Sequence, residues 1–309
     1  MSTRWFGRRA GFAAARYLMI ALCIAGVIRI ETASGQGTAQ ALVTQPPMDT
    51  SPKPWTGKRL PDGQPDLQGG VWYVPSGGTR SVENLGETHQ TSAGLAKETR
   101  GLSRIVDPPD GRIPHQPWAL ARQKEQEFGL DNPTKPEHVD PQARCIQGFP
   151  RYHYYVSNYR ILQPPGMVIF AFELYHVFRV IRLDGSPHIG PSMKLWWGDS
   201  VGRWDGNSLV VDTTNLNGKI RVSMKGDFIT DQGRLRERFV VVDANTIIYE
   251  VTIDDPTVYT RPWTMRVEQK RGPRDPGGEN PGELWEDTCH EGQESRPSVM
   301  PAYNPGGPK

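Results

Sequence analysis

The chain contains little cysteine and few of the short motifs that carry cofactor chemistry. Only three of its 309 residues are cysteines, and two of them, Cys145 and Cys289, lie beyond residues 1–41. Two thiols are too few for an all-thiolate zinc site. A glycine-rich phosphate loop, a dinucleotide fingerprint and a Gly-x-Ser-x-Gly elbow are absent, and the seven histidines show no metal-ligand spacing. We therefore expect neither a cofactor nor a bound metal.

Long apolar runs are also scarce, and the one present lies near the N-terminus. Residues 17–28 are apolar, follow several arginines and precede small residues. This order is typical of a secretory signal peptide. Twelve apolar residues span a hydrocarbon core of ~30 Å poorly, which leaves an uncleaved anchor as the weaker alternative. We predict a signal peptide over residues 1–41, cleaved near residues 33–35 or 39–41, and a periplasmic or secreted protein.

An excess of positive charge is missing once the signal is removed. The whole chain has a net charge of +2, but residues 1–41 hold five arginines and one glutamate, so the remainder carries −2. Without a basic stripe, nucleic-acid binding is not expected. We expect a small-molecule ligand as partner and no stable membrane insertion after signal removal, and the sequence predicts no oligomeric state.

Export bears on the two remaining cysteines. Compartments outside the cytoplasm permit disulfides, so Cys145 and Cys289 are expected to pair and to tie the C-terminal part to the segment before the predicted sheet. Two buried, unpaired thiols are the alternative.

Residues 154–269 consist of short apolar or alternating runs separated by turn sequences such as Asp-Gly-Asn and Pro-Pro-Gly. Such spacing is typical of an antiparallel sheet that returns on itself. The expected strands are Tyr154–Leu162, Met167–Glu173, His176–Leu183, Ser200–Trp204, Ser208–Thr213, Leu235–Val242, Thr246–Ile253 and Trp263–Gln269. We predict an all-β protein with an antiparallel up-and-down barrel, lipocalin-like in architecture, with long N-terminal loops and one or two short helices. A β-sandwich is the alternative.

The remaining segments complete a single-domain organisation. Residues 42–69 are rich in proline and glycine and are expected to form an extended arm, and residues 70–292 the barrel domain. Within the domain, Pro117–Phe128 has good helix formers after an N-terminal proline, and Gly129 is expected to end that helix. Residues 293–309 have the composition of a disordered tail.

Several motifs resemble a large family of secreted bacterial proteins of unassigned function. They are the stretches 55–69 and 107–114, the long motif 198–214 (GDSVGRWDGNSLVVDTT) and the Cys-His-Glu-Gly sequence at 289–292. The resemblance implies export and a β-rich single domain, and it assigns no catalytic residue. The Gly-x-Trp-Tyr sequence at 70–73 additionally resembles the opening of lipocalin barrels.

Candidate catalytic residues lie at the end of one strand and in the C-terminal motif. Glu173 follows an apolar strand, where desolvation can tune a carboxyl group for general acid–base catalysis; an ion pair with Arg179 or Arg182 is the structural alternative. His176 pairs with Glu173 only if a hairpin tip separates them. His290 is the third candidate, although the His-Glu-x-x-His zinc signature is incomplete there.

Candidate ligand-binding residues gather where aromatic side chains lie close to charged ones. Apolar walls with a few polar groups are typical of small-molecule sites. The candidates are Tyr155, Arg179, Trp196, Trp197, Asp199, Arg203 and Trp204. The sequence therefore predicts an exported barrel that binds a small apolar or aromatic molecule, with cofactor-independent isomerase, lyase, cyclase or hydrolase chemistry as one branch. A carrier or envelope interaction module without turnover is the alternative, and a carbohydrate-binding sandwich a more distant one.

Overall fold

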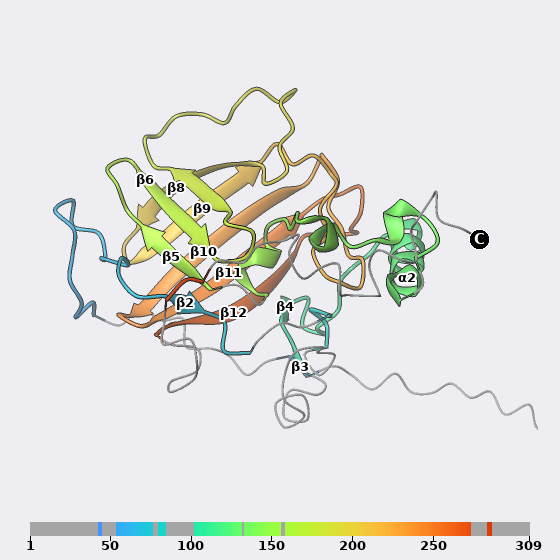
Figure 1. Cartoon of the computed structure of the whole chain (residues 1–309), viewed down its shortest axis with the longest axis horizontal. Helices are drawn as coiled ribbons and strands as arrows, with labels where there is room; N and C mark the ends of the chain where they lie inside the picture. Colours follow the sequence, from blue (N-terminus) through green and yellow to red (C-terminus); the bar gives the residue numbers. More distant parts are fainter. Residues whose placement is uncertain are drawn as a thin grey trace, which may run out of the picture. The chain divides into compact units, whose positions relative to one another are not determined.

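The computed structural model describes residues 43–44, 54–76, 80–84, 102–131, 133–155, 158–272 and 283–285. Strands dominate these residues, with one α-helix and short 3₁₀ turns (Figure 1). The elements are β1 (Val43–Thr44), β2 (Trp72–Tyr73), β3 (Leu102–Ser103), β4 (Ile105–Asp107), α2 (Pro117–Asp131), η1 (Pro136–His138), η2 (Pro141–Arg144), η3 (Arg151–His153), β5 (Tyr159–Leu162), β6 (Met167–Phe172), β7 (Phe178–Arg182), β8 (Asp199–Asp205), β9 (Ser208–Thr214), β10 (Arg234–Asp243), β11 (Thr246–Asp254) and β12 (Trp263–Arg271).

Nine strands close into a barrel in the order β11-β10-β9-β8-β7-β6-β5-β2-β12, with β12 pairing back onto β11. The predicted all-β barrel is therefore confirmed. Strand β4 adds to β12 outside the ring, and β1 pairs with β3 in a separate two-stranded sheet. Closure leaves the barrel strands without a free edge, because each one has a partner on both sides.

Two features of the ring depart from a simple up-and-down order. Strand β7 pairs with β8 in parallel, through Arg182 and Val201, since the long connection 183–198 returns the chain to the same end of the barrel. Strand β2, far earlier in the sequence, lies between β5 and β12 and pairs through Trp72 with Tyr159. The N-terminal part of the domain thus supplies the strand that completes the ring.

The alternating side chains of the long strands explain how they line the barrel. In β12 the buried positions are Trp263, Met265, Val267 and Gln269, and the residues between them are half-buried. Successive side chains of a strand point to opposite faces, so one face packs inward while the other meets solvent. Strands β8 and β9 are joined by a tight turn in which Gly206 has φ 58°, a conformation that favours glycine.

Helix α2 forms where the sequence predicts a helix, but its predicted end at Gly129 is wrong. The helix continues to Asp131. Gly129 packs directly against the ring of His138 in η1, and a Cβ atom there would overlap the imidazole. The glycine therefore serves a close approach between two elements instead of a helix end. Among the described residues, no helix has the length and apolar character needed to cross a membrane.

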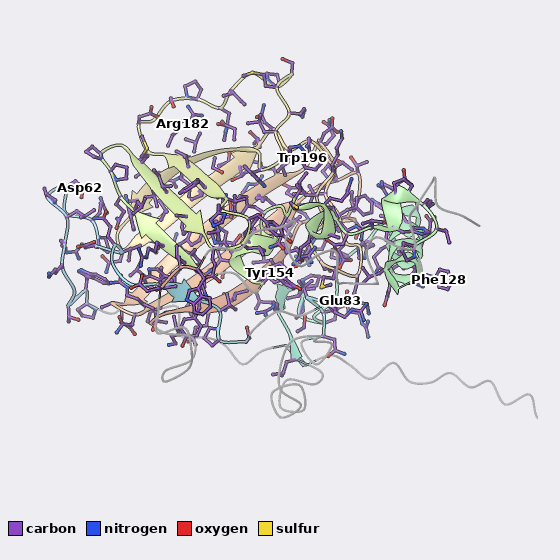
Figure 2. All side chains as sticks on the ribbon, viewed as in Figure 1. Asp62, Glu83, Phe128, Tyr154, Arg182 and Trp196 are labelled. Atoms are coloured by element: carbon purple, nitrogen blue, oxygen red, sulfur yellow. The ribbon has the colours of Figure 1, made fainter. Side chains whose placement is uncertain are left out.

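Aromatic side chains make up a large part of the buried core. Figure 2 shows the described side chains on the ribbon, with Tyr154 of this core labelled. Most of the aromatic rings lie 4.8–6.0 Å apart in tilted or edge-on arrangements, and Phe170 and Phe172 are stacked at 6.3 Å. The cluster comprises Phe149, Tyr152, His153, Tyr159, Phe170, Phe172, Phe239 and Tyr249. This part of the barrel is a packed core.

Candidate functional site

A buried ion pair lies among these aromatic rings. Arg179 of β7 donates to both carboxylate oxygens of Glu237 in β10, at 2.9 Å to Oε1, and both residues are at most 3% exposed. The guanidinium also donates to Thr213 Oγ1 at 2.9 Å and to Ser200 Oγ at 3.1 Å. Burial lowers the pKa of Arg179, but the Glu237 carboxylate outweighs it and leaves that pKa raised. Arg179 is thus bound to internal partners.

His153 of η3 belongs to the same cluster. Its Nε2 lies 2.9 Å from Arg179 Nη1, so this nitrogen accepts the hydrogen bond and the ring proton resides on Nδ1. Burial, followed by the charge of Arg179, holds the pKa of His153 well below its usual value. The imidazole is therefore neutral, and its Nδ1 is a buried donor without a hydrogen-bond partner in the described part of the chain.

Glu173 and His176 lie in the turn between β6 and β7. The carboxylate of Glu173 is half-buried and accepts hydrogen bonds from Asn158 Nδ2 at 3.2 Å and from the backbone N–H of Trp285 at 3.0 Å. His176 is exposed, and its backbone is in the left-handed region with φ 51°. Its backbone N–H donates to the backbone carbonyl of Glu173 at 3.3 Å. Their side chains make no hydrogen bond with each other in the described residues. His290 lies outside those residues.

The predicted aromatic ligand residues occupy different places. Trp196 is half-buried and lines a cavity described below. Trp197 donates its Nε1–H to Gln147 O at 2.8 Å. Trp204 packs partly buried against the core, and Tyr155 is a buried member of it. Trp196 is therefore the member of this group that the structure places in a cavity.

Apart from the buried Arg179, the predicted charged ligand residues lie in strand β8. Asp199 at the start of β8 accepts from Arg182 at 2.9 Å and lies 2.8 Å from His188 Nδ1. Arg203 in the same strand is exposed. Arg182, the suggested alternative partner of Glu173, is thus paired with Asp199.

Cys145 lies at the end of η2 in a left-handed conformation, with φ 63°. Cys289 lies outside the described residues, so the disulfide stays a prediction. The neighbourhood is compatible with it. Trp285 contacts Glu173, and Tyr175 donates its hydroxyl to Gln142 O in η2 at 2.7 Å. Cys289 is the fourth residue after Trp285 in the sequence, so their Cα atoms are at most about 13 Å apart.

A cavity of about 510 Å³ lies outside the barrel, between helix α2, the loop 108–115 and the segment that precedes β10. We call it the polar cavity. Its lining includes Glu83, His115 and Asp227, with Gln123 of α2 beside them. The side chains of His115 and Asp227 are 6% and 7% exposed. The cavity therefore brings two carboxyl groups and an imidazole together.

The contacts of these three groups give each a distinct environment. His115 Nε2 lies 3.1 Å from Asp227 Oδ1, close enough for an ion pair although not aligned as a hydrogen bond, and Ser223 Oγ donates to the other carboxylate oxygen. Glu83 Oε1 accepts the backbone N–H of Ile113 at 2.6 Å. Burial raises the pKa of Glu83, Asp227 adds to the rise, and the Ile113 bond with the charges of Arg112 and His115 opposes it.

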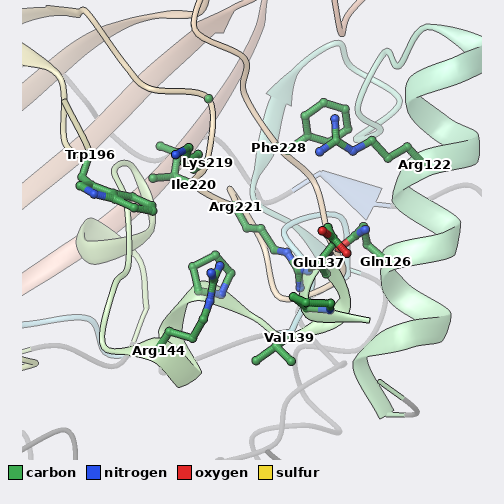
Figure 3. Close-up of a pocket in the computed structure, with 14 residues that line it drawn as sticks. Arg122, Gln126, Glu137, Val139, Arg144, Trp196, Lys219, Ile220, Arg221 and Phe228 are labelled. Atoms are coloured by element: carbon green, nitrogen blue, oxygen red, sulfur yellow. Dashed lines mark hydrogen bonds between the residues drawn. The ribbon is translucent and has the colours of Figure 1, made fainter. Parts of the chain in front are cut away.

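A second cavity of about 380 Å³ adjoins helix α2, and four of its fourteen lining residues are basic. We call it the basic cavity. Its cations are Arg122, Arg144, Lys219 and Arg221, its one lining carboxylate is Glu137, and Trp196 and Phe228 add aromatic faces (Figure 3).

The sequence pattern does not predict that Glu83, His115 and Asp227 line one cavity. They come from three separate loop segments, far apart in the chain, and no spacing rule connects them. Long loops are where binding residues concentrate, which is the general signal that residues 75–116 carry. In the described ranges, no three His, Cys, Asp or Glu side chains gather closely enough to hold a metal ion.

Together these features define an all-β barrel protein with a packed, charge-bearing interior and cavities built from its loops and helix. Comparisons of the chain with protein-family models, with curated proteins and with solved structures find no match.

Proposed function

We propose that the chain is an exported barrel protein that performs cofactor-independent acid–base chemistry on a small polar molecule in the polar cavity. One observation carries the proposal: a half-buried carboxyl with a raised pKa, Glu83, lines the same cavity as the His115–Asp227 pair. Cavities that hold titratable groups in such different environments are typical of catalytic sites. Export rests on the predicted signal at residues 1–41.

The three side chains have complementary roles in a proton transfer. The Asp227 carboxylate lies 3.1 Å from Nε2 of His115, where its charge stabilises the imidazolium that forms when Nδ1 acts as the base. Glu83, kept protonated to higher pH than an exposed glutamate, is the acid. In a small hydroxycarbonyl compound, His115 takes a proton from the carbon next to the carbonyl while Glu83 protonates the carbonyl oxygen. The imidazolium then delivers its proton to the former carbonyl carbon. The hydroxyl on the first carbon gives its proton to the Glu83 carboxylate, which forms the new carbonyl group and restores the acid.

The lining of the polar cavity decides the class of substrate. Beside the three groups named above, its walls hold Asp110, Arg112, Glu127 and further charged side chains, and few apolar ones. A polar wall of mixed charge favours a small polar molecule over the apolar or aromatic one that the aromatic inventory of the sequence suggests.

Solvent deuterium exchange tests this function. The full mature chain is incubated with dihydroxyacetone in D₂O, and NMR follows loss of the carbon-bound protons and formation of glyceraldehyde. We expect exchange above the protein-free rate, lowered by about 10²- to 10⁴-fold in Glu83→Gln and His115→Gln, the usual worth of a general acid or base.

The matched control is Glu125→Gln, which removes a carboxylate from the exposed side of α2 that lines neither cavity. This variant should keep the wild-type rate. Equal rates in wild type and Glu83→Gln would contradict the proposal. Unchanged dihydroxyacetone affinity with no turnover in either protein would identify a carrier.

A further inference from the structure

The basic cavity carries more positive charge than its neighbours neutralise. Four cations line it against the single carboxylate of Glu137, which is exposed to solvent. Figure 3 shows Arg144 on one segment of the cavity wall and Lys219 and Arg221 on another. Like charges held this close repel one another, so an anion in the cavity lowers the electrostatic energy of all of them.

Arg221 is the most constrained of these cations. Its side chain is 7% exposed, and its Nη2 donates to Gln126 Oε1 and to the backbone carbonyl of Glu137. Its Nη1 is buried and has no hydrogen-bond partner among the described residues. A buried guanidinium N–H without an acceptor destabilises the protein, because it has lost its hydrogen bonds to water. A ligand with an acceptor atom in the cavity would restore a hydrogen bond to this group.

The nearest carboxylate does not compensate Arg221. Asp140 Oδ2 lies 3.8 Å from Arg221 Nη1, but the same carboxylate accepts two hydrogen bonds from Arg151, at 2.9 and 3.0 Å, and one from the backbone of Gln142. One carboxylate therefore serves two buried guanidinium groups. The pKa of Arg221 is lowered, first by burial and then by the charges of Arg151, Arg144 and Arg122 against the opposing Asp140.

Two aromatic side chains give the cavity apolar faces. Arg122 lies over the ring of Phe228, with its guanidinium carbon 4.3 Å from the ring centroid, and Lys219 Nζ lies 5.8 Å from that of Trp196. At about 380 Å³ the cavity is also larger than an inorganic anion requires. Cations and aromatic rings side by side suit a ligand with a charged group on a flat apolar body.

We propose that the basic cavity is a binding site for a small organic anion, a carboxylate or phosphate monoester attached to an aromatic or other flat apolar group. Arg221 and Arg144 bind the anionic group, and Trp196 and Phe228 contact the apolar body. This site is separate from the polar cavity, so Glu83→Gln, which abolishes the proposed proton transfer, leaves anion binding intact.

Isothermal titration calorimetry on the full mature chain tests the proposal with four probes: benzoate, phenyl phosphate, inorganic phosphate and the neutral benzyl alcohol. We expect benzoate or phenyl phosphate to bind at least tenfold more tightly than both benzyl alcohol and inorganic phosphate. Their affinity should fall as salt is raised, because the attraction is between charges. Preference between the two aromatic anions identifies the anionic group.

Variants locate the site. Arg144→Gln and Lys219→Gln change exposed side chains, so both variants are expected to fold. Arg221→Gln changes a buried side chain and can prevent folding, so it is not used as a test. Arg144→Gln and Lys219→Gln should each weaken binding of the preferred anion about three- to tenfold, and the exposed Arg203→Gln, which lines neither cavity, should not. Equal binding of benzoate and benzyl alcohol, no binding of either aromatic anion, or full affinity in the Arg144→Gln/Lys219→Gln double variant would overturn the proposal.

Discussion

The buried pair of Arg179 and Glu237 offers the sharpest test of how this barrel is stabilised. Glu237→Gln keeps the size of the side chain but removes its charge. It replaces one of the two carboxylate oxygens that accept hydrogen bonds from Arg179 with an NH₂ group, so two hydrogen-bond donors then face each other. Arg179 then remains buried as an uncompensated cation. Breaking such a pair from one side costs about 3–5 kcal/mol.

The expected loss is a large share of the stability of the protein. Folded domains are stable by about 5–15 kcal/mol, so a loss of about 3–5 kcal/mol in Glu237→Gln should remove about a fifth of the stability or more. Two hydroxyl groups lose part of their acceptor as well, since Thr213 Oγ1 at 3.0 Å and Tyr249 OH at 2.7 Å both donate to Glu237. In urea unfolding, the midpoint should fall by about 1 M or more with an unchanged m-value.

A surface pair provides the control. Arg238 Nη1 lies 3.1 Å from Asp205 Oδ2, a distance like that inside the barrel, but these side chains are 41% and 58% exposed. Asp205→Asn should therefore cost about 0–1 kcal/mol. The double variant Arg179→Met/Glu237→Leu should be more stable than Glu237→Gln, because it buries no charge. A loss below about 1 kcal/mol in Glu237→Gln would refute this account of the interior.

Two further predictions concern burial of histidine and packing of glycine. The pKa of His153 in the folded protein lies well below its value in the unfolded chain, so below about pH 6.5 the unfolded chain binds a proton that the folded protein does not. The free energy of unfolding should therefore be unaffected by this histidine above about pH 6.5. Below that pH it should fall by up to about 1.4 kcal/mol per pH unit. Urea unfolding between pH 7 and 5 measures this, and a slope unchanged in His153→Phe would contradict it. Gly129→Ala should destabilise by about 1–3 kcal/mol despite the better helix propensity of alanine, because the added methyl group overlaps the ring of His138; a raised melting temperature would show that η1 moves aside freely.

The barrel was predictable because its strands carry their own pattern. In β11, Ile247, Tyr249, Val251 and Ile253 share one face and are all buried, while the other face is mostly polar apart from Ile248. β10 carries a readable polar signal too, since Glu237 occupies a position in the inward-facing row with Leu235 and Phe239. A carboxylate in such a row requires a buried cation, so the alternation of β10 indicates the buried ion pair as well as the strand.

The cavities were not predictable in the same way. His115 and Asp227 meet only because the loop 108–115 and the segment before β10 both pack beside α2, and contacts between loops leave no periodicity in a sequence. The predicted end of helix α2 was wrong for a related reason. A glycine in a helical pattern indicates either a stop or a close approach, and only the position of His138 decides between them.

Residues 225–228 form a partition with a different lining on each side. Lys225 and Asp227 face the polar cavity, whereas Gly226 and Phe228 face the basic one. Gly226, at φ 97°, fits so closely against Gln126 that no side chain could be added there. The two cavities therefore share one short backbone segment, and a displacement of residues 225–228 changes the lining of both.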